Sequence, residues 1–120
     1  MKILIVDDER AMRKLLSMML APNHDVLAVG GVDEALQELT TGQWDILLTD
    51  YKMPGKSGLE LIEHLMAEGS TLPVILITGQ GSRDDNITRV RTRVHKILAK
   101  PFSHEVLLAA ITELAPASAG

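Results

Sequence analysis

The sequence predicts an α/β fold in which a five-stranded parallel sheet is covered by helices on both faces. Five short, continuously apolar runs alternate with longer segments whose apolar residues repeat at helical spacing. Strands without polar alternation are typical of parallel sheets, because helices cover both faces of such a sheet. A length of 120 residues fits one such domain. The five apolar runs that predict strands are residues 3–6, 25–29, 45–49, 73–78 and 96–99.

Each apolar run is followed by a segment that predicts a helix. Ser57 and Glu60 have the spacing of a capping box, which predicts the start of the third helix. Ser82 with Asp85 gives a weaker start for the fourth helix, and the fifth is predicted to follow Ser103. The apolar positions expected to face the sheet are Met12, Leu15, Leu16, Met19, Val32, Ala35, Leu36, Leu39, Leu59, Ile62, Met66, Ile87, Val90, Val94, Val106, Leu107, Ala110, Ile111 and Leu114.

Composition and charge exclude several classes of function. Without cysteine, neither a disulfide framework nor a thiolate metal site is possible. A net charge of −4 and an aromatic content of 2% argue against nucleic-acid binding, because neither a basic track nor a stacking platform is present. The apolar runs are far shorter than the roughly 20 residues that span a bilayer. The N-terminus also lacks the pattern of a signal peptide, so we expect a cytoplasmic protein without membrane contact.

Polar and charged side chains follow four of the five predicted strands. Asp7 and Asp8 follow the first strand, Asp50 the third, Thr78 ends the fourth, and Lys100 follows the fifth. In an open parallel sheet, ligands bind beyond the carboxyl ends of the strands, so these side chains are expected to converge. An acidic turn after one strand has a simple explanation as a solvated helix cap. Four strand ends with such residues favour a functional site instead.

The chemistry of this set favours phosphoryl transfer with a divalent cation. Clustered carboxylates offer only oxygen ligands, which suit Mg²⁺ and also Mn²⁺. A lysine and a hydroxyl nearby can neutralise and position phosphoryl oxygens. No Gly-x-x-x-x-Gly-Lys loop is present to hold a nucleotide, so the phosphoryl group is expected on the protein itself. Asp50 is the best acceptor, because it projects alone from a central strand while Asp7 and Asp8 form a pair.

Four motifs in chain order resemble the receiver domain of two-component response regulators. They are "VDDE" (6–9), "LLTDYKMPGKSGLEL" (47–61), "PVILITG" (73–79) and "LAKPF" (98–102). The resemblance covers residues 2 to about 114, so we expect a receiver domain over residues 1–114. Residues 115–120 would be a tail or the start of a linker. The resemblance also implies a flavodoxin-like strand order of 2-1-3-4-5.

The resemblance implies a role for each site residue. Asp50 would receive its phosphoryl group from a sensor histidine kinase or a phosphotransfer protein. Asp8 and Asp50 would bind Mg²⁺ directly, Asp7 through water, and Lys52 through its main-chain carbonyl. The protein would catalyse only its own phosphorylation and dephosphorylation and would not otherwise be an enzyme.

The resemblance also implies how the signal leaves the domain. Thr78 would be the switch hydroxyl, and Lys100 would contact the phosphoryl group and precede Pro101 with a cis peptide bond. The fourth helix, the fifth strand and the fifth helix would form the surface read by an output domain, a protein partner or a second copy. The nature of the output and the cognate kinase are left open.

Three places depart from the family pattern or vary within it. Ile97 occupies the position of an aromatic residue that usually turns inward, so a threonine–aromatic switch is not implied. Lys52 and Gln80 lie where the family varies the lifetime of the phosphoryl group. Val94 and His95 replace the usual Gly-Ala, so the turn before the last strand is not predicted.

Two alternatives remain at this point. An aspartate-nucleophile phosphohydrolase also uses Mg²⁺, Asp, Thr and Lys, but it normally needs a second Asp two residues after the nucleophile. Here that position is Lys52. A flavin-binding module shares the topology, but the loop after its first strand needs hydroxyls and free amides, whereas here this loop is acidic.

Overall fold

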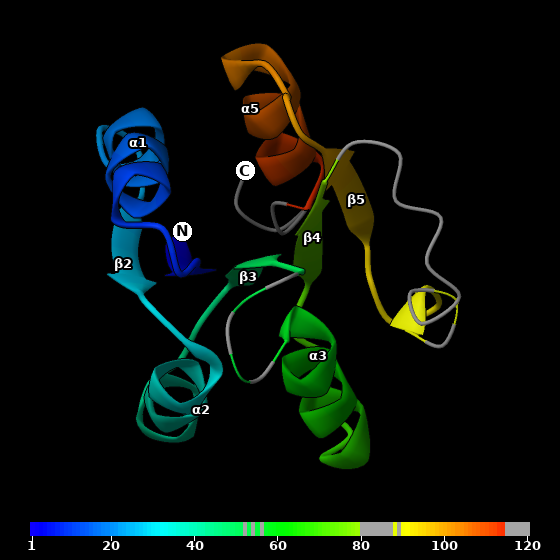
Figure 1. Cartoon of the computed structure of the whole chain (residues 1–120). Helices are drawn as coiled ribbons and strands as arrows, with labels where there is room; N and C mark the ends of the chain where they lie inside the picture. The colour runs from blue at the N-terminus through cyan, green and yellow to red at the C-terminus, as the bar shows by residue number, and fades with distance from the viewer. Residues whose placement is uncertain (52, 54, 56, 80–87, 89, 115–120) are drawn as a thin grey trace.

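The computed structural model describes residues 1–51, 53, 55, 57–79, 88 and 90–114. Strands and helices alternate along residues 2–78, and a strand and a helix follow at residues 96–113, in agreement with the sequence pattern (Figure 1). Most of the predicted fourth helix lies outside the described residues. No helix in these ranges is both long and apolar enough to cross a membrane. The elements are β1 (Lys2–Val6), α1 (Arg10–Leu20), β2 (Asp25–Val29), α2 (Val32–Thr41), β3 (Ile46–Asp50), α3 (Gly58–Ala67), β4 (Val74–Thr78), β5 (Lys96–Ala99) and α5 (His104–Glu113).

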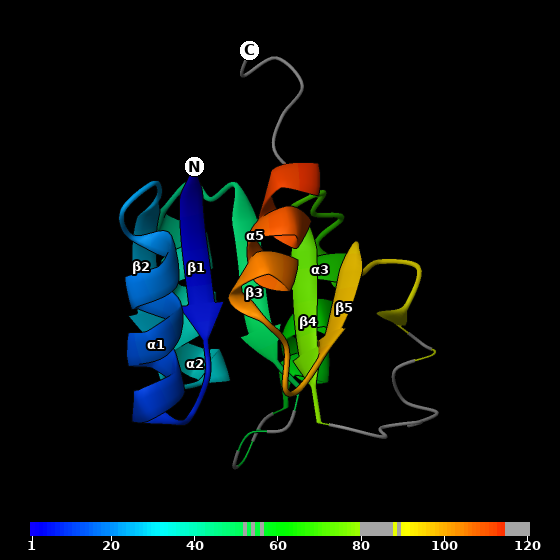
Figure 2. The ribbon, with the colours of Figure 1, turned by 90° about the horizontal axis from the view of Figure 1, so that it is seen from above.

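The five strands form one parallel sheet with the order β2-β1-β3-β4-β5. The arrowheads of all strands therefore point to the same edge, and the segments that carry the polar motifs leave the sheet there (Figure 2). β3 is the central strand, with β1 on one side and β4 on the other. This order confirms the predicted fold and the predicted convergence of the strand ends.

Two hydrophobic layers enclose the sheet. Alternate residues of a strand point to opposite faces, so Ile3 and Ile5 of β1 pack under α1 and α5. Leu4 and Val6 point the other way and pack under α2 and α3. Figure 1 shows the same division, with α1 and α5 on one side of the sheet and α2 and α3 on the other. The three inner strands β1, β3 and β4 are almost wholly buried.

The edge strands depart from the prediction of strands buried on both faces. β2 alternates between exposed and half-buried residues before Val29, and β5 buries only Leu98 completely. Each edge strand pairs with one neighbouring strand only and lies at the margin of the sheet, so the helices cover less of its surface. Ile97, which stands at the usual aromatic position, is half-buried and packs against the layer under α2 and α3.

The helices face the sheet with a register that the sequence predicted only in part. Leu15, Met66 and Val106 were expected inward but are exposed. The residues that complete the buried faces of α1 and α3 are instead Leu20, Leu61 and Leu65. Helical spacing predicts an apolar stripe about 100° wide or more on the helix surface. It does not determine the centre of that stripe to better than one residue. Ile87 lies outside the described residues, while Val90 is buried and Val94 is half-buried.

The two serines predicted to begin helices behave differently. The side chain of Ser103 accepts a hydrogen bond from Val106 N at 3.1 Å, so it caps α5 as expected. Ser57 precedes α3, but its side chain makes no capping hydrogen bond, so the predicted capping box is wrong in this detail. The Ser57 carbonyl accepts from Glu60 N at 3.1 Å instead. Ser82 and Asp85 lie outside the described residues.

His95 forms the turn that the family pattern did not predict. Its main-chain N–H donates to Val74 O at 2.9 Å. Its ring Nδ1 accepts from Val74 N at 3.3 Å. His95 therefore satisfies both main-chain groups of Val74 at the point where β4 begins, and it aligns β5 with β4.

Candidate functional site

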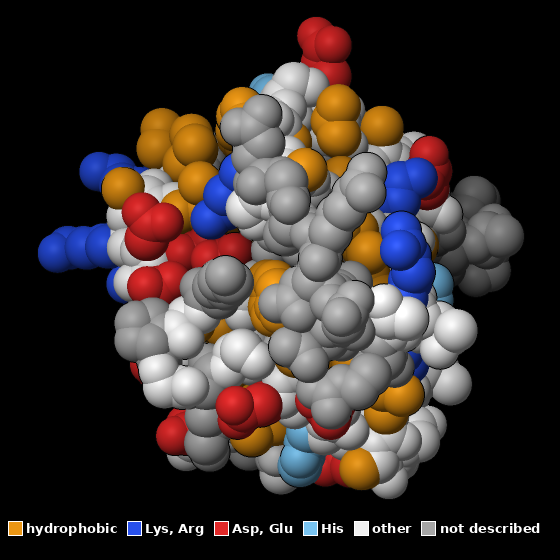
Figure 3. All heavy atoms as spheres, turned by 45° about the vertical axis from the view of Figure 1, so that its right-hand side comes forward, with side chains coloured by type: hydrophobic (Ala, Val, Ile, Leu, Met, Phe, Trp, Pro, Cys, Tyr) orange, Lys and Arg blue, Asp and Glu red, His pale blue; other side chains and the backbone are white. Residues whose placement is uncertain are grey.

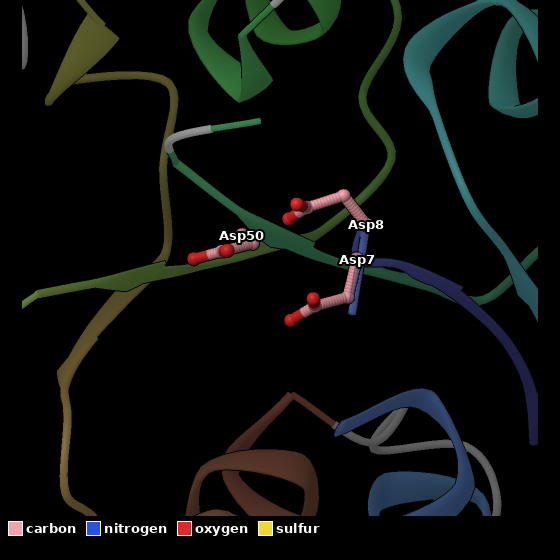
Figure 4. Close-up of side chains that lie close together, drawn as sticks. All are labelled: Asp7, Asp8 and Asp50. Carbon is pink, nitrogen blue, oxygen red and sulfur yellow. The ribbon is translucent and has the colours of Figure 1, made fainter. Parts of the chain in front are cut away.

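Three carboxylates lie together at the carboxyl edge of the sheet. Asp7 and Asp8 directly follow β1, and Asp50 ends β3. The register pairs Val6 with Thr49, so the residue after each comes to the same level of the sheet. One carboxylate oxygen from each residue lies within 4.8 Å of one from each of the others. The three side chains extend toward a common space (Figure 4), as the sequence predicts.

Two of these carboxylates are buried, and one of their oxygens has no hydrogen-bond partner within the described ranges. Asp7 is 0% exposed and Asp50 is 6% exposed, whereas Asp8 is exposed. Asp7 Oδ1 accepts from Glu9 N at 2.8 Å, and Asp50 Oδ1 accepts from Tyr51 N at 3.0 Å. Asp7 Oδ2 is buried without a hydrogen-bond partner among the described residues. Because an unsatisfied buried oxygen is costly, this oxygen and its neighbours fit a bound cation.

Burial dominates the electrostatics of the site. It raises the pKa of Asp7 and of Asp50 above the ordinary value of 3.8. The hydrogen bond from Glu9 N opposes this rise in the pKa of Asp7, and the charge of Lys100 opposes the rise in the pKa of Asp50. The neighbouring carboxylates raise the pKa of both groups further. Both shifts mean that the ionised form of these carboxyl groups is disfavoured at the site, first by burial and then by repulsion between the carboxylates, and a bound cation would relieve both effects.

The direction of these shifts predicts how the metal-free protein responds to pH. As the pH rises from about 3.8, the unfolded chain loses these protons first, so the folded state binds more protons and the free energy of unfolding falls until the pH exceeds the raised pKa values. An Asp7→Asn variant lacks part of this penalty. Thermal melts in chelator between pH 4 and pH 7 should therefore show a smaller fall in Tm for the variant. Saturating Mg²⁺ should reduce the fall in the parent.

A matched control makes this measurement specific. Asp25→Asn removes an exposed carboxylate at the start of β2, and it should follow the parent across the same pH range. If Asp7→Asn and the parent lose Tm equally with rising pH, the buried carboxylates carry no such penalty.

Lys100 and Thr78 complete the predicted set at this edge. Lys100 Nζ lies 3.4 Å from Asp50 Oδ2, close enough for a hydrogen bond and an ion pair. The main-chain N–H of Lys100 donates to Thr78 O at 2.8 Å, which joins the ends of β4 and β5. Thr78 is 3% exposed and lies one residue beyond Ile77, the partner of Asp50 across the sheet. The Lys100–Pro101 peptide bond is cis, as the resemblance implies.

Two site predictions lie outside the described residues, and one contact was missed. The main-chain carbonyl of Lys52 and the side chain of Gln80 belong to positions that the structure does not describe. The missed residue is Arg13, whose Nη1 donates to the carbonyl of Asp7 at 2.7 Å. The sequence signal that could have indicated Arg13 is its place directly after Met12, which packs against the core.

Basic and acidic side chains are both present on the face of the molecule that Figure 3 shows. In Figure 3 the described basic side chains lie toward the two sides of the face, and acidic side chains lie beside both groups. Among the described side chains, this face therefore has no continuous basic track of the kind that follows a phosphate backbone.

The fold and the site together define a class of protein. A doubly wound parallel sheet with an acidic cluster and a lysine at its carboxyl edge is typical of a phosphoryl-accepting signalling module. The family model of the response regulator receiver domain matches residues 3–112. The chain belongs to this receiver-domain family of two-component response regulators. This membership favours the signalling module over the phosphohydrolase and the flavin-binding alternatives.

Curated relatives agree with the family. The chain is 33% identical to the two-component response regulator PhoP of Pseudomonas aeruginosa, over 100% of this chain and 54% of that protein. It is 32% identical to the phosphate regulon transcriptional regulatory protein PhoB of Escherichia coli, over 92% of this chain and 49% of that protein. A chemotaxis protein CheY homolog of Campylobacter jejuni is 35% identical, over 89% of this chain and 86% of that protein. The chain therefore spans about half the length of PhoP and PhoB and most of the CheY homolog.

Solved structures show the same fold. The response regulator protein TrrA of Thermotoga maritima, in complex with Mg(2+)-BeF, superimposes with a TM-score of 0.83 at 26% identity and covers 94% of this chain and 97% of that chain. A response regulator receiver domain protein of Clostridium thermocellum gives a TM-score of 0.85 at 28% identity, with 94% and 92% covered.

Proposed function

We propose that this chain is switched by phosphorylation of Asp50. The observation that carries the proposal is the cluster of Asp7, Asp8 and Asp50, whose carboxylate oxygens lie within 4.8 Å of one another. Lys100 Nζ lies 3.4 Å from Asp50 Oδ2, on the residue that ends the central strand. Asp50 thus has a cation beside it and two further carboxylates that can hold a metal.

The proposed cofactor is Mg²⁺, which Mn²⁺ could replace. Asp8 and Asp50 would bind the metal directly, Asp7 would bind it through water, and the main-chain carbonyl of Lys52 would add a ligand. Asp7 Oδ2 has no hydrogen-bond partner among the described residues, and this oxygen and the all-oxygen donor set support the assignment. The Mg(2+)-BeF complex of TrrA, a relative in fold and sequence, supports it further. When bound, Mg²⁺ would neutralise the carboxylates and the phosphoryl oxygens.

The transfer itself moves one phosphoryl group without any redox change. A carboxylate oxygen of Asp50 attacks the phosphorus, a new O–P bond forms, and the bond from phosphorus to the donor breaks. With a phosphohistidine donor, the leaving group is the imidazole nitrogen. Lys100 would move from the Asp50 carboxylate to the added phosphoryl oxygens, and the Thr78 hydroxyl would donate to one of them.

The proposed partners follow from this role. A sensor histidine kinase or a phosphotransfer protein would supply the phosphoryl group, and an output domain, a protein partner or a second copy would read the result. The receiver unit would span residues 1–114, and it would catalyse only its own phosphorylation and dephosphorylation. The reading surface would comprise the fourth helix predicted after Thr78, together with β5 and α5. Residues 80–87 and 89, which include most of that predicted helix, lie outside the described residues.

Labelling with a small phosphodonor tests the proposal. Incubation with acetyl phosphate and Mg²⁺ should add one acid-stable, base-labile acyl phosphate to the intact protein, as measured by mass spectrometry. Chelator should suppress the labelling, because the crowded carboxylates then repel the incoming anion. Peptide mapping should place the group on residues 46–51, within β3 and its end. Labelling that is unaffected by chelator, or that maps to another segment, would contradict the proposal.

A further inference from the structure

The end of β1 contains a carbonyl that the sheet does not satisfy. The main-chain N–H of Asp7 donates to Val29 O at 3.1 Å and so extends the ladder between β1 and β2 by one bond. In a parallel ladder, the next bond would run from the N–H of Gly31 to the carbonyl of Asp7. Gly31 is already the N-cap of α2, and the chain turns away there. The ladder therefore ends before the Asp7 carbonyl has a strand partner.

Arg13 takes the place of that missing partner. Its Nη1 donates to Asp7 O at 2.7 Å, a short contact from a charged donor in a partly buried position. Gly30 provides the room for it, since a Cβ built there would lie 3.3 Å from Arg13 Nη1. The same point lies 3.6 Å from Glu34 Oε1, so the guanidinium lies between the end of β1, the turn after β2, and α2.

The peptide unit that Arg13 holds is the one that joins Asp7 to Asp8. Asp7 is anchored further by burial and by the hydrogen bond from Glu9 N to its Oδ1. Asp8 is exposed, and its carboxylate makes no hydrogen bond or ion pair within the described part of the chain. The direction of its side chain therefore depends on the orientation of the Asp7–Asp8 peptide.

We propose that Arg13 is a positioning residue for the metal site, which holds the Asp7–Asp8 peptide so that the Asp8 carboxylate faces Asp50. Arg13 touches neither the metal nor the phosphoryl group and acts through Asp8. This inference rests on the proposed function, because Asp8 is a direct ligand only if the acidic cluster holds Mg²⁺. It also gives a role to a half-buried guanidinium that contacts the end of β1.

Three variants test the inference on the full chain. Arg13→Met keeps the length of the side chain and removes every donor, while Arg13→Lys restores one charged donor. Lys14→Met is the matched control, since it removes an exposed cation from the same helix. The Kd for Mg²⁺ alone is measured by titration calorimetry, and the Tm is measured in chelator. Arg13→Met should weaken Mg²⁺ binding by about tenfold, as is typical for partners that orient metal ligands. Arg13→Lys should recover part of this loss, and Lys14→Met should bind like the parent.

A double-mutant cycle with Asp8→Asn separates positioning from general stability. If Arg13 acts through Asp8, the effect of Arg13→Met on the Mg²⁺ Kd should disappear in the Asp8→Asn background. An Arg13→Met protein that melts at a lower temperature in chelator but binds Mg²⁺ as tightly as the parent would overturn the inference. So would an equal loss of affinity in both backgrounds. A parent chain that does not bind Mg²⁺ at all would overturn the proposed function, and this inference with it.

Discussion

An Asp50→Asn variant is expected to take up no phosphoryl group from acetyl phosphate, with labelling reduced to background. The amide replaces the nucleophilic carboxylate oxygen but keeps nearly the same shape, so the residue still fits its buried place at the end of β3. Lys100 loses its anionic partner, since the 3.4 Å contact to Asp50 Oδ2 then meets a neutral group. Intact-protein mass spectrometry after incubation with the donor and Mg²⁺ measures the result.

The control for this experiment is Asp25→Asn, in which an exposed carboxylate far from the cluster is changed. It should be labelled as fully as the parent. Full labelling of Asp50→Asn would show that another residue accepts the phosphoryl group. Steady turnover of small phosphate esters by the parent would instead favour the phosphohydrolase alternative, since a signalling module should be labelled without such turnover.

The second large effect is expected from Gly58→Ala, which should lower the free energy of unfolding by about 1 to 3 kcal/mol, the usual cost of overpacking. A Cβ on Gly58 would lie 2.1 Å from the main-chain oxygen of Asp50 and 3.2 Å from Thr49 Oγ1. The main-chain N–H of Gly58 also donates to Tyr51 O at 2.7 Å, which holds the start of α3 against the end of β3. Either α3 or the Asp50 backbone must move. Urea denaturation of the metal-free protein measures the loss.

The displacement should also reach the acceptor. Because the clash is with the backbone of Asp50 itself, the Gly58→Ala protein should be phosphorylated more slowly even when it is fully folded. Gly31→Ala is the control, since a Cβ there meets nothing within 4 Å and should cost only the N-cap difference, about 0.5 kcal/mol. Equal stability of the two variants would mean that α3 can shift without cost.

The sequence by itself determined the fold class and most of the site. Continuous apolar runs over the inner strands β1, β3 and β4 are typical of burial on both faces, which a parallel sheet covered by helices provides. Once the sheet is parallel, all strand ends meet at one edge. The convergence of Asp7, Asp50 and Lys100 therefore followed from their positions after strands, without knowledge of any contact.

The tertiary structure alone decided which side chains are buried within each pattern. Leu15 and Leu20 of α1 are both leucines at plausible spacing, yet only Leu20 lies against the sheet, because the rotation of a helix about its axis is set by packing and not by period. The exposure of β2 and β5 likewise depends on which strands come to the edges.

The details of the acidic site also depend on contacts between distant segments. Asp7 Oδ2, which lacks a hydrogen-bond partner in the described part of the chain, and the contact between Gly58 and the Asp50 carbonyl both occur where the end of one strand meets another element. Arg13 reaches the Asp7 carbonyl because β2 turns away one bond too early to satisfy it. Local periodicity can be interpreted one segment at a time, so the sequence specifies which residues come to the site. Only the folded chain specifies their partners, because a hydrogen bond depends on the relative placement of elements to within a fraction of an ångström.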